Sequence, residues 1–394
     1  MRTKRLLILV GSVCLALMLA LPLVASCGPA TPEAAEEEIA ALESKLAAEK
    51  AKSAGLEDDV ADLEDEIAAL RAPAEVYEWK FTSWSSPGSY YGDEAYPAYC
   101  QEIEDMTGGQ ITVEYIGAGA LAGELGAFDA VRAGVVELGC PWVGGYDTIL
   151  VEAKVEYGLP FGLRDSREVL TLLWVRGWEE ILREAYSELD PPLYYLASDI
   201  WSPIYMMTNV PITSLDELGE LKIRAFGSAA KYLEKLGVGA IVPIVWEELY
   251  TAIATGTIDG ALGLGIGEYY DIKFYEFAKY IVNPAFISPV AGADYVVNID
   301  AWNSLPEGLQ AVIYGAAKAA SAEGGVVGWT DYEVEGVAKM FDLGCSYTQI
   351  RDADIPVMVE MASELWDEVA ATSPRNAEMM EIYVDYMRDL GYME

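Results

Sequence analysis

The apolar and polar positions follow three different patterns along the 394 residues of this chain. Residues 6–23 form one nearly continuous apolar run. Between residues 39 and 70, apolar positions recur with a period of seven. From residue 73 onward, short alternating stretches are interleaved with longer stretches of helical period. These patterns predict an export leader, a helical stalk and an α/β body.

The body is predicted to alternate strands with helices. The expected strands are residues 79–84, 111–116, 137–142, 193–197, 204–209, 221–226, 258–262 and 295–298. The expected helices are residues 93–106, 124–133, 166–189, 246–254, most of 306–341, and two helices between 352 and 390, with a further helix starting at 227. Regular β-α alternation indicates an α/β fold with largely parallel sheets, and its length suits two lobes with a cleft between them. Ligands of open α/β sheets bind at the carboxyl ends of the strands.

The leader carries the features of a secretory signal. Arg2, Lys4 and Arg5 precede the apolar run, which ends in Val24-Ala25-Ser26-Cys27. Small residues before a cysteine resemble the lipobox of bacterial lipoproteins. We therefore expect cleavage of residues 1–26 and lipid attachment at Cys27, which would tether the protein outside the cytoplasm. A plain signal peptide and an uncleaved anchor helix are the alternatives.

The stalk is predicted within residues 27–72. Its heptad frame leaves Glu49 and Ser53 as the two polar seam positions, so the pattern is that of a coiled coil with a weak middle. A homo-oligomer through residues 39–70 and a monomeric helical spacer are both compatible with it. Acidic residues outnumber basic ones here, which opposes parallel association.

Composition narrows the possible chemistry. There are 64 acidic residues against 25 Lys and Arg, for a formal charge of −39, which excludes a basic footprint for nucleic acid. The chain has no histidine, so His-dependent nucleophilic catalysis and His-ligated zinc are excluded. After Cys27, the cysteines are Cys100, Cys140 and Cys345, an odd number without a CxxC spacing, and whether any two pair is left open.

A series of motifs resembles one protein family. The motifs are Met106-Thr107-Gly108-Gly109-Gln110-Ile111, Ala120-Leu121 followed by Val131-Arg132-Ala133-Gly134, Leu159-Pro160-Phe161-Gly162, Leu221-Lys222-Ile223-Arg224, Glu248-Leu249-Tyr250, Gly256-Thr257-Ile258-Asp259-Gly260 and Ala301-Trp302-Asn303-Ser304-Leu305-Pro306. Their order and spacing resemble the DctP-type solute-binding proteins of tripartite ATP-independent periplasmic (TRAP) transporters, over about residues 77–390.

The resemblance implies a periplasmic-binding-protein-like fold of two lobes, joined by hinge strands and a long C-terminal helix. The first lobe would comprise residues 73–201 with about 287–330, and the second 202–286 with about 331–394. The implied function is an extracytoplasmic receptor that binds a small organic acid and delivers it to TRAP membrane subunits, without a cofactor. An extracytoplasmic carboxylate-dependent enzyme on the same framework is the alternative.

The resemblance also implies a carboxylate anchor. Arg224 occupies the position of the family's signature arginine, near the carboxyl end of a strand and just before a helix. A guanidinium binds a carboxylate in bidentate fashion and keeps its charge at all relevant pH values. Members that bind their ligand through a metal carry a Glu-Trp pair after the Ile-Asp-Gly motif, where this chain has Leu262 and Gly263. We therefore expect metal-free binding.

Aromatic residues are the remaining candidates for the site. Where many family members have a polar ligand residue before the arginine, this chain has Trp201 and Tyr205. The candidate lining is Trp84, Trp142, Tyr146, Trp201 and Tyr205, with Gly263 in a hinge or pocket loop. Each aromatic residue could equally be ordinary core.

Overall fold

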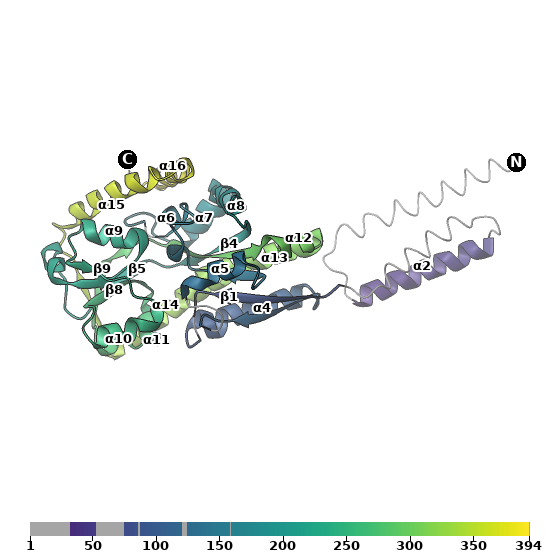
Figure 1. Cartoon of the computed structure of the whole chain (residues 1–394), viewed down its shortest axis with the longest axis horizontal. Helices are drawn as coiled ribbons and strands as arrows, with labels where there is room; N and C mark the ends of the chain where they lie inside the picture. The colour runs from purple at the N-terminus through teal and green to yellow at the C-terminus, as the bar shows by residue number, and fades with distance from the viewer. Residues whose placement is uncertain (1–31, 53–74, 86, 120–123, 158, 394) are drawn as a thin grey trace.

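The computed structural model describes residues 32–52, 75–85, 87–119, 124–157 and 159–393. The predicted leader and Cys27 lie outside these residues, as does the second half of the stalk. The first half of the stalk is the helix α2 (Pro32–Lys52), drawn apart from the body in Figure 1. Along α2 the seam residue Leu42 is buried, at 7% exposure. No helix in the described ranges combines the length and the apolar character needed to cross a bilayer.

The first sheet has five strands in the order β2-β1-β3-β10-β4. Strands β1 and β2 are parallel, as are β1 and β3, whereas β10 runs antiparallel to both β3 and β4. The strands are β1 (Tyr77–Ser83), β2 (Ile111–Ile116), β3 (Leu138–Cys140), β4 (Leu193–Trp201) and β10 (Val290–Asn298). The chain connects them through η1 (Tyr91–Ala95), α4 (Tyr96–Met106), η2 (Glu124–Gly126), α5 (Ala127–Arg132), η3 (Val143–Gly145), α6 (Ala153–Glu156), α7 (Ser166–Arg176) and α8 (Trp178–Ser187).

The second sheet has six strands in the order β11-β9-β5-β8-β6-β7. Its strands are β5 (Ile204–Thr208), β6 (Lys222–Arg224), β7 (Ala240–Ile241), β8 (Gly260–Leu264), β9 (Tyr280–Ile287) and β11 (Ser346–Gln349). Pairs β6/β7, β6/β8 and β9/β11 are parallel, while β5 is antiparallel to β8 and β9. The intervening helices are η4 (Leu215–Glu220), α9 (Gly227–Lys235), η5 (Trp246–Glu248), α10 (Leu249–Ala254), α11 (Ile266–Asp271) and η6 (Phe274–Glu276).

Two antiparallel strand pairs run from one sheet into the other. Strand β4 leads through two residues into β5, and β9 leads likewise into β10. At the crossing, Trp201 pairs with Val290 in the first sheet and Ile204 pairs with Ile287 in the second. A third connection follows from α12 (Ile299–Ser304) and consists of α13 (Glu307–Ala320), the π-helical η7 (Ser321–Gly328) and α14 (Trp329–Asp342). The two sheets therefore belong to two α/β lobes linked at three places.

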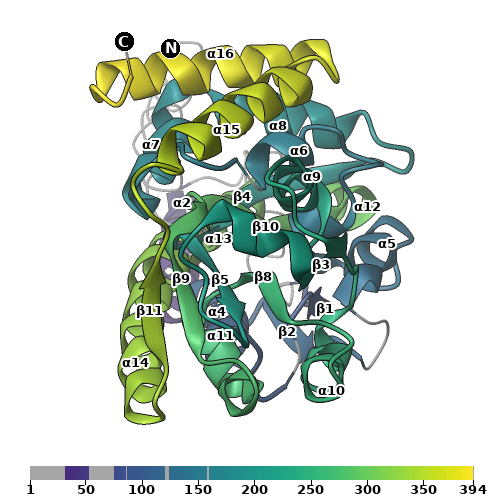
Figure 2. The ribbon, with the colours of Figure 1, turned by 90° about the vertical axis from the view of Figure 1, so that its left-hand side faces the viewer.

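The last two helices lie across one end of the body. Figure 2 shows α15 (Ile355–Ala370) and α16 (Pro374–Asp389) above α7, α8 and α9. α16 packs on α6, α7 and α8, and α15 packs on α9. The end of the chain thus touches helices that the sequence assigns to the first lobe, and the lobe boundaries given above remain a prediction.

Several predicted elements have different bounds in the structure. The single helix expected at residues 166–189 is two helices in the structure. Gly177 adopts a left-handed backbone conformation, with φ +103, and this ends α7. Strands β9 and β11 have no counterpart among the predicted strands, and β10 begins five residues before its prediction. Every residue of β10 is buried, so it lacks the alternation by which a half-exposed strand is recognised.

The three cysteines of the body are free and buried. Cys140 lies at the end of β3, where its sulfur accepts a hydrogen bond from the Tyr96 hydroxyl at 3.4 Å. All three therefore act as small packing residues in this structure.

Candidate functional site

Arg224 is the last residue of β6 and is buried, at 2% exposure. Its Nε donates to the carbonyl oxygen of Ile244 at 3.0 Å, and its Nη1 donates to that of Leu262 at 3.4 Å. The chain turns sharply afterwards, since Gly227 has φ +52 as it begins α9. The parallel pairing of β6 with β8 places Arg224, at the carboxyl end of β6, opposite Ala261, the second residue of β8. The predicted anchor therefore occupies the edge of the sheet where α/β proteins bind ligands.

Gly263 lies directly against this guanidinium. It has φ +116, and a Cβ at this position would stand 2.8 Å from Arg224 Nη1 and 3.2 Å from the hydroxyl of Tyr157. The Tyr157 hydroxyl also donates to the Gly263 carbonyl oxygen at 3.5 Å. The absence of a side chain at Gly263 is therefore what lets Arg224 and Tyr157 approach the same point.

Aromatic rings from both lobes surround Arg224. Its Cζ lies 4.8 Å from the ring centroid of Phe226 and 5.8 Å from that of Trp142. Trp142 packs edge-to-face on Tyr157, with ring centroids 5.4 Å apart. Tyr157 packs edge-to-face on Trp201, with ring centroids 6.1 Å apart. Trp142 follows β3 of the first sheet, whereas Arg224 ends β6 of the second. The rings around Arg224 therefore come from segments of both sheets.

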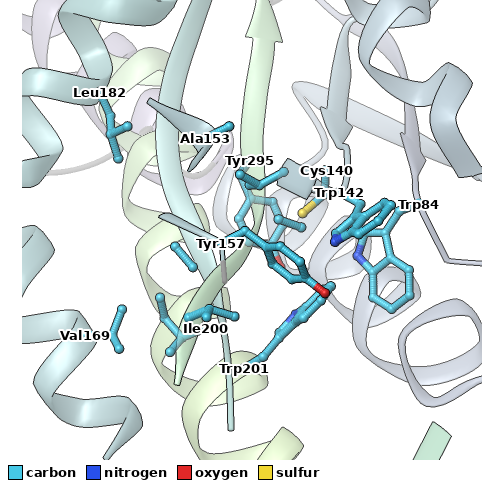
Figure 3. Packing of buried hydrophobic residues seen from close by; sticks show 14 of the residues in the cluster. Trp84, Cys140, Trp142, Ala153, Tyr157, Val169, Leu182, Ile200, Trp201 and Tyr295 are labelled. Atoms are coloured by element: carbon cyan, nitrogen blue, oxygen red, sulfur yellow. The ribbon is translucent and has the colours of Figure 1, made fainter. Parts of the chain in front are cut away.

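Trp84 extends this ring set. Its ring centroid is 5.0 Å from that of Trp201 and 6.5 Å from that of Trp246. Figure 3 shows Trp84, Trp142, Tyr157 and Trp201 among the buried side chains of the core. We call Trp84, Trp142, Tyr157, Trp201 and Phe226 the aromatic box; Phe226 is partly buried, and the other four residues are at most 5% exposed.

One polar atom of the aromatic box has no partner. Trp84 Nε1 is buried and makes no hydrogen bond in the structure, whereas Trp201 Nε1 donates to Asp199 Oδ2 at 3.4 Å. A buried N–H without a partner costs about 1–3 kcal/mol, so such groups are rare and call for an explanation.

Two of the predicted lining residues point elsewhere. Tyr146 stacks on Phe128 at 4.0 Å, and its hydroxyl bonds with that of Tyr186 at 2.6 Å, inside the first lobe. Tyr205 lies near Tyr347 of β11, with ring centroids 6.1 Å apart. Neither is in ring contact with the aromatic box. Trp201 ends β4 of the first sheet, whereas Tyr205 lies in β5 of the second, so the two side chains do not share one sheet face.

Sequence reasoning missed three members of this neighbourhood: Tyr157, Phe226 and Trp246. Phe226 follows Arg224 by two residues, which is a signal that the strand-to-helix turn could have supplied. Tyr157 is the residue immediately after α6, and it precedes the Leu159-Pro160-Phe161 motif. Nothing in its local pattern indicates that it reaches Gly263.

Buried carboxyl groups lie around the site. Asp199 accepts from Tyr91 and Tyr96 as well as from Trp201, and burial raises its pKa to about 7. Burial also raises the pKa of Glu268 well above its usual range, although a hydrogen bond from the Gly265 N–H and the charge of Arg224 act in the opposite direction. Both groups therefore favour the neutral form more than an exposed carboxyl group does.

The acidic side chains do not gather in a way that suits a cation. Within the described ranges, no group of three or more Asp, Glu or Cys side chains is arranged to hold a metal ion.

Comparisons with known proteins agree with this architecture. The family of bacterial extracellular solute-binding proteins, family 7 (DctP), matches residues 81–373. A monocarboxylate 2-oxoacid-binding periplasmic protein of Nostoc sp. is 24% identical over 312 residues, covering 77% of this chain and 82% of that protein. The C4-dicarboxylate-binding protein DctP of Rhodobacter capsulatus is also 24% identical, over 79% of this chain and 90% of its own length.

Solved structures are similar over the whole body. A TRAP solute-binding protein of Colwellia psychrerythraea, with bound calcium and pyruvate, has a TM-score of 0.74 at 23% identity, covering 80% of this chain and 95% of that one. A TRAP solute-binding protein of Bordetella bronchiseptica, with calcium and picolinate, has a TM-score of 0.73 at 21% identity, covering 80% and 93%. The two-lobed fold is therefore shared, and the chain belongs to the bacterial extracellular solute-binding proteins of family 7.

Proposed function

We propose that this protein is the extracytoplasmic receptor of a TRAP transporter, which closes on a small organic acid and delivers it to the membrane subunits. The observation that carries the proposal is the buried guanidinium of Arg224 between the two lobes. Its two carbonyl partners orient the group. A carboxylate ligand would accept two parallel, charge-assisted hydrogen bonds from this guanidinium.

The geometry also explains how binding would be coupled to closure. Arg224 and Phe226 belong to the second lobe, and Trp142 and Tyr157 belong to the first. A ligand held by Arg224 would be enclosed only when the first lobe brings its aromatic side chains over it. The ligand would thereby stabilise the closed arrangement, since it contacts both lobes only there.

Further support comes from the names of relatives. The Nostoc relative is described as binding monocarboxylate 2-oxoacids, and the Rhodobacter relative as binding C4-dicarboxylates. By analogy, we propose that Arg224 binds a small carboxylate and that the protein passes this ligand to TRAP membrane subunits. Cys27 would attach the protein to the outer face of the cell membrane.

The experiment that tests this function has two steps. The purified protein is denatured, and any released solute is identified by mass spectrometry. Calorimetry with that solute then compares the wild type with Arg224→Ala, Arg224→Lys and the control Arg176→Ala, whose guanidinium lies at the surface beside Asp389 at 2.8 Å.

Losing one buried partner of a charge pair costs about 2–5 kcal/mol, so Arg224→Ala should weaken binding by about 30-fold or more. Arg224→Lys should recover only part of the affinity because the fork is lost. Arg176→Ala should leave binding unchanged, as should a chelator. Unchanged binding by Arg224→Ala would refute the anchor. Chemical conversion of the solute by the wild type would favour the enzyme alternative.

A further inference from the structure

Two buried carboxyl groups, those of Glu268 and Glu333, meet at the start of α11. Glu333 of α14 accepts hydrogen bonds from the backbone N–H groups of Ile266 at 2.7 Å and of Gly267 at 2.9 Å. Glu268 of α11 accepts one from the N–H of Gly265 at 2.8 Å. Three consecutive backbone donors therefore serve two carboxyl groups, each of which has two acceptor oxygens.

The packing of α14 on α11 holds this pair in place. A Cβ on Gly336 of α14 would stand 2.5 Å from the Cα of Gly267, so the helices approach this closely because position 336 carries no side chain. Glu268 is 3% exposed and Glu333 is 8% exposed. A negative charge on either group is therefore compensated mainly by protein groups rather than by water.

Arg224 is a cation close to this pair. Its Nη1 donates to the carbonyl oxygen of Leu262, and the hydroxyl of Tyr269 donates to that of Ala261 at 2.6 Å. The start of α11 thus lies over the same stretch of β8 as the guanidinium. Burial raises the pKa of Glu268 well above its usual range, and the charge of Arg224 acts against this rise.

The other titratable neighbours oppose a second negative charge. Asp271 of α11 accepts a hydrogen bond from the Tyr332 hydroxyl at 2.5 Å, and Lys339 offsets part of its charge. Asp271 adds to burial in raising the pKa of Glu268, and likewise that of Glu333, which reaches about 7. The phenol groups that face the pair have pKa values raised by burial and stay neutral; they belong to Tyr205, Tyr269, Tyr332 and Tyr347.

The hydrogen bonds make Glu268 the member of the pair that takes up a proton more readily. Glu333 receives two N–H groups, which stabilise its ionised form, whereas Glu268 receives one and depends in part on the charge of Arg224. A ligand carboxylate at Arg224 would bring a further negative charge to the same buried region. The ionised form of Glu268 would then lose the support of the guanidinium.

We infer that carboxylate binding at Arg224 is accompanied by uptake of one proton from solvent, which binds to a carboxyl oxygen of the Glu268–Glu333 pair. The affinity for the acid therefore falls as the pH rises through neutrality. Glu268 is a positioning residue in this scheme, because it acts on the ligand through the charge of Arg224. The inference rests on the proposed function, since it requires Arg224 to hold the carboxylate.

A double-mutant cycle tests the link without any ligand. Arg224→Gln removes the positive charge that a bound carboxylate would neutralise. Glu268→Gln keeps an amide oxygen to accept from the Gly265 N–H but cannot ionise. Urea unfolding of the four proteins gives the coupling between the two changes. The coupling should change the unfolding equilibrium constant by about 5-fold or more at pH 8.5 and by less than about 2-fold at pH 5.5. The same coupling at both pH values would overturn the inference.

The matched control replaces Glu268→Gln with Glu156→Gln in the cycle. Glu156 is also buried, but the charges that act on it are those of Asp294 and Glu152. Its coupling to Arg224→Gln should not change with pH. A change as large as that of the Glu268 cycle would show a general effect of buried carboxyl groups and overturn the role of the pair.

Proton uptake by the wild-type full chain is a second measurement that needs no variant. Pyruvate and fumarate are the probes, because both stay ionised between pH 6 and 8. Calorimetry in HEPES and in Tris, whose ionisation enthalpies differ, counts the protons taken up per probe bound. We expect about 0.3 proton or more at pH 7.5, and an affinity about 3-fold to 10-fold lower at pH 8 than at pH 6. Binding without uptake would overturn the inference.

The outcomes also separate this inference from the proposed function. Glu268→Gln should lose most of the pH dependence of probe binding, whereas Glu156→Gln should keep it. Probe binding that needs Arg224 but takes up no proton would uphold the receptor and overturn this inference alone. Probe binding that is unchanged in Arg224→Ala would overturn both. If neither probe binds, the double-mutant cycle decides the inference.

Discussion

The backbone of Gly263 and the guanidinium of Arg224 are packed so closely that a Cβ on Gly263 would stand 2.8 Å from Arg224 Nη1. The two residues come from neighbouring parallel strands, with Arg224 at the end of β6 and Gly263 near the end of β8. The position of the anchor therefore depends on a residue that could not itself bind a ligand through a side chain.

Gly263→Ala should lower both stability and affinity. At φ +116 an alanine is strained by about 1–3 kcal/mol, and its Cβ would displace the guanidinium. We expect the affinity for the retained solute to fall by about 10-fold or more, measured by calorimetry beside thermal unfolding.

Gly344→Ala is the matched control for this change. Gly344 also has a positive φ, +84, but a Cβ there would meet no atom within 4 Å. It should lower stability while leaving affinity unchanged. An affinity of Gly263→Ala equal to that of the wild type would show that Arg224 tolerates the displacement.

Stability should fall as the pH rises from about 4 to 7. Burial raises the pKa of Asp199 and of Glu333 to about 7, and that of Asp294 to about 6. Between the unfolded pKa, about 4, and these values, the folded state binds more protons than the unfolded state, so each group lowers the free energy of unfolding by about 1.4 kcal/mol per pH unit. Urea unfolding at several pH values measures this slope, and a free energy of unfolding that rises over this range would contradict it.

Glu156→Gln should remove part of this pH dependence. Glu156 is 2% exposed, and neither carboxyl oxygen has a hydrogen-bond partner. Burial, together with the nearby Asp294 and Glu152, raises its pKa well above the usual range. The variant should be more stable than the wild type by about 1–3 kcal/mol at pH 7.5 and equally stable at pH 4. The exposed Glu78→Gln is the control, and a gain that is the same at both pH values would argue for a packing effect instead.

Cys27→Ser should release the protein from membranes. The basic residues, the apolar run and the Val24-Ala25-Ser26-Cys27 order predict lipid attachment at this thiol. Fractionation of cells and mass spectrometry of the N-terminal peptide measure the outcome, with Cys100→Ser as the control because Cys100 is buried in the body. Membrane retention of Cys27→Ser, or an N-terminal peptide of the wild type without lipid mass, would count against the anchor.

Deletion of residues 28–72 should convert an oligomer into a monomer. The heptad seam between residues 39 and 70 would be buried between chains, and α2 shows that its first part is helical. Sedimentation of both forms measures the number of chains per particle. The same number in both forms would favour the monomeric spacer.

Much of the fold follows from local pattern. Strand β2 has the predicted bounds, since Ile111 and Val113 are buried while Glu114 is exposed. The helices α15 and α16 also agree with the predicted pair that is parted near Ser373. These elements carry their periodicity within a few residues, because one face packs on the body and the other meets water.

The position of Arg224 could likewise be derived from the sequence. A strand that ends in an arginine and is followed by a glycine and a helix places that side chain at the edge where α/β sheets bind ligands. The motif resemblance pointed to the same residue.

Only the tertiary structure decided which aromatic residues join it. Trp84, Trp142 and Trp201 come from three separate segments of the chain. They meet because Trp84 follows β1, Trp142 follows β3 and Trp201 ends β4, and these strands lie in one sheet. Tyr205 was an equally suitable candidate from the sequence, but it lies in β5 of the second sheet, where its ring is near that of Tyr347. A shift of one residue reverses the face that a side chain occupies, and register between distant strands depends on the packing of both sheets. Composition could therefore predict an aromatic site, whereas its members depended on contacts that no local segment contains.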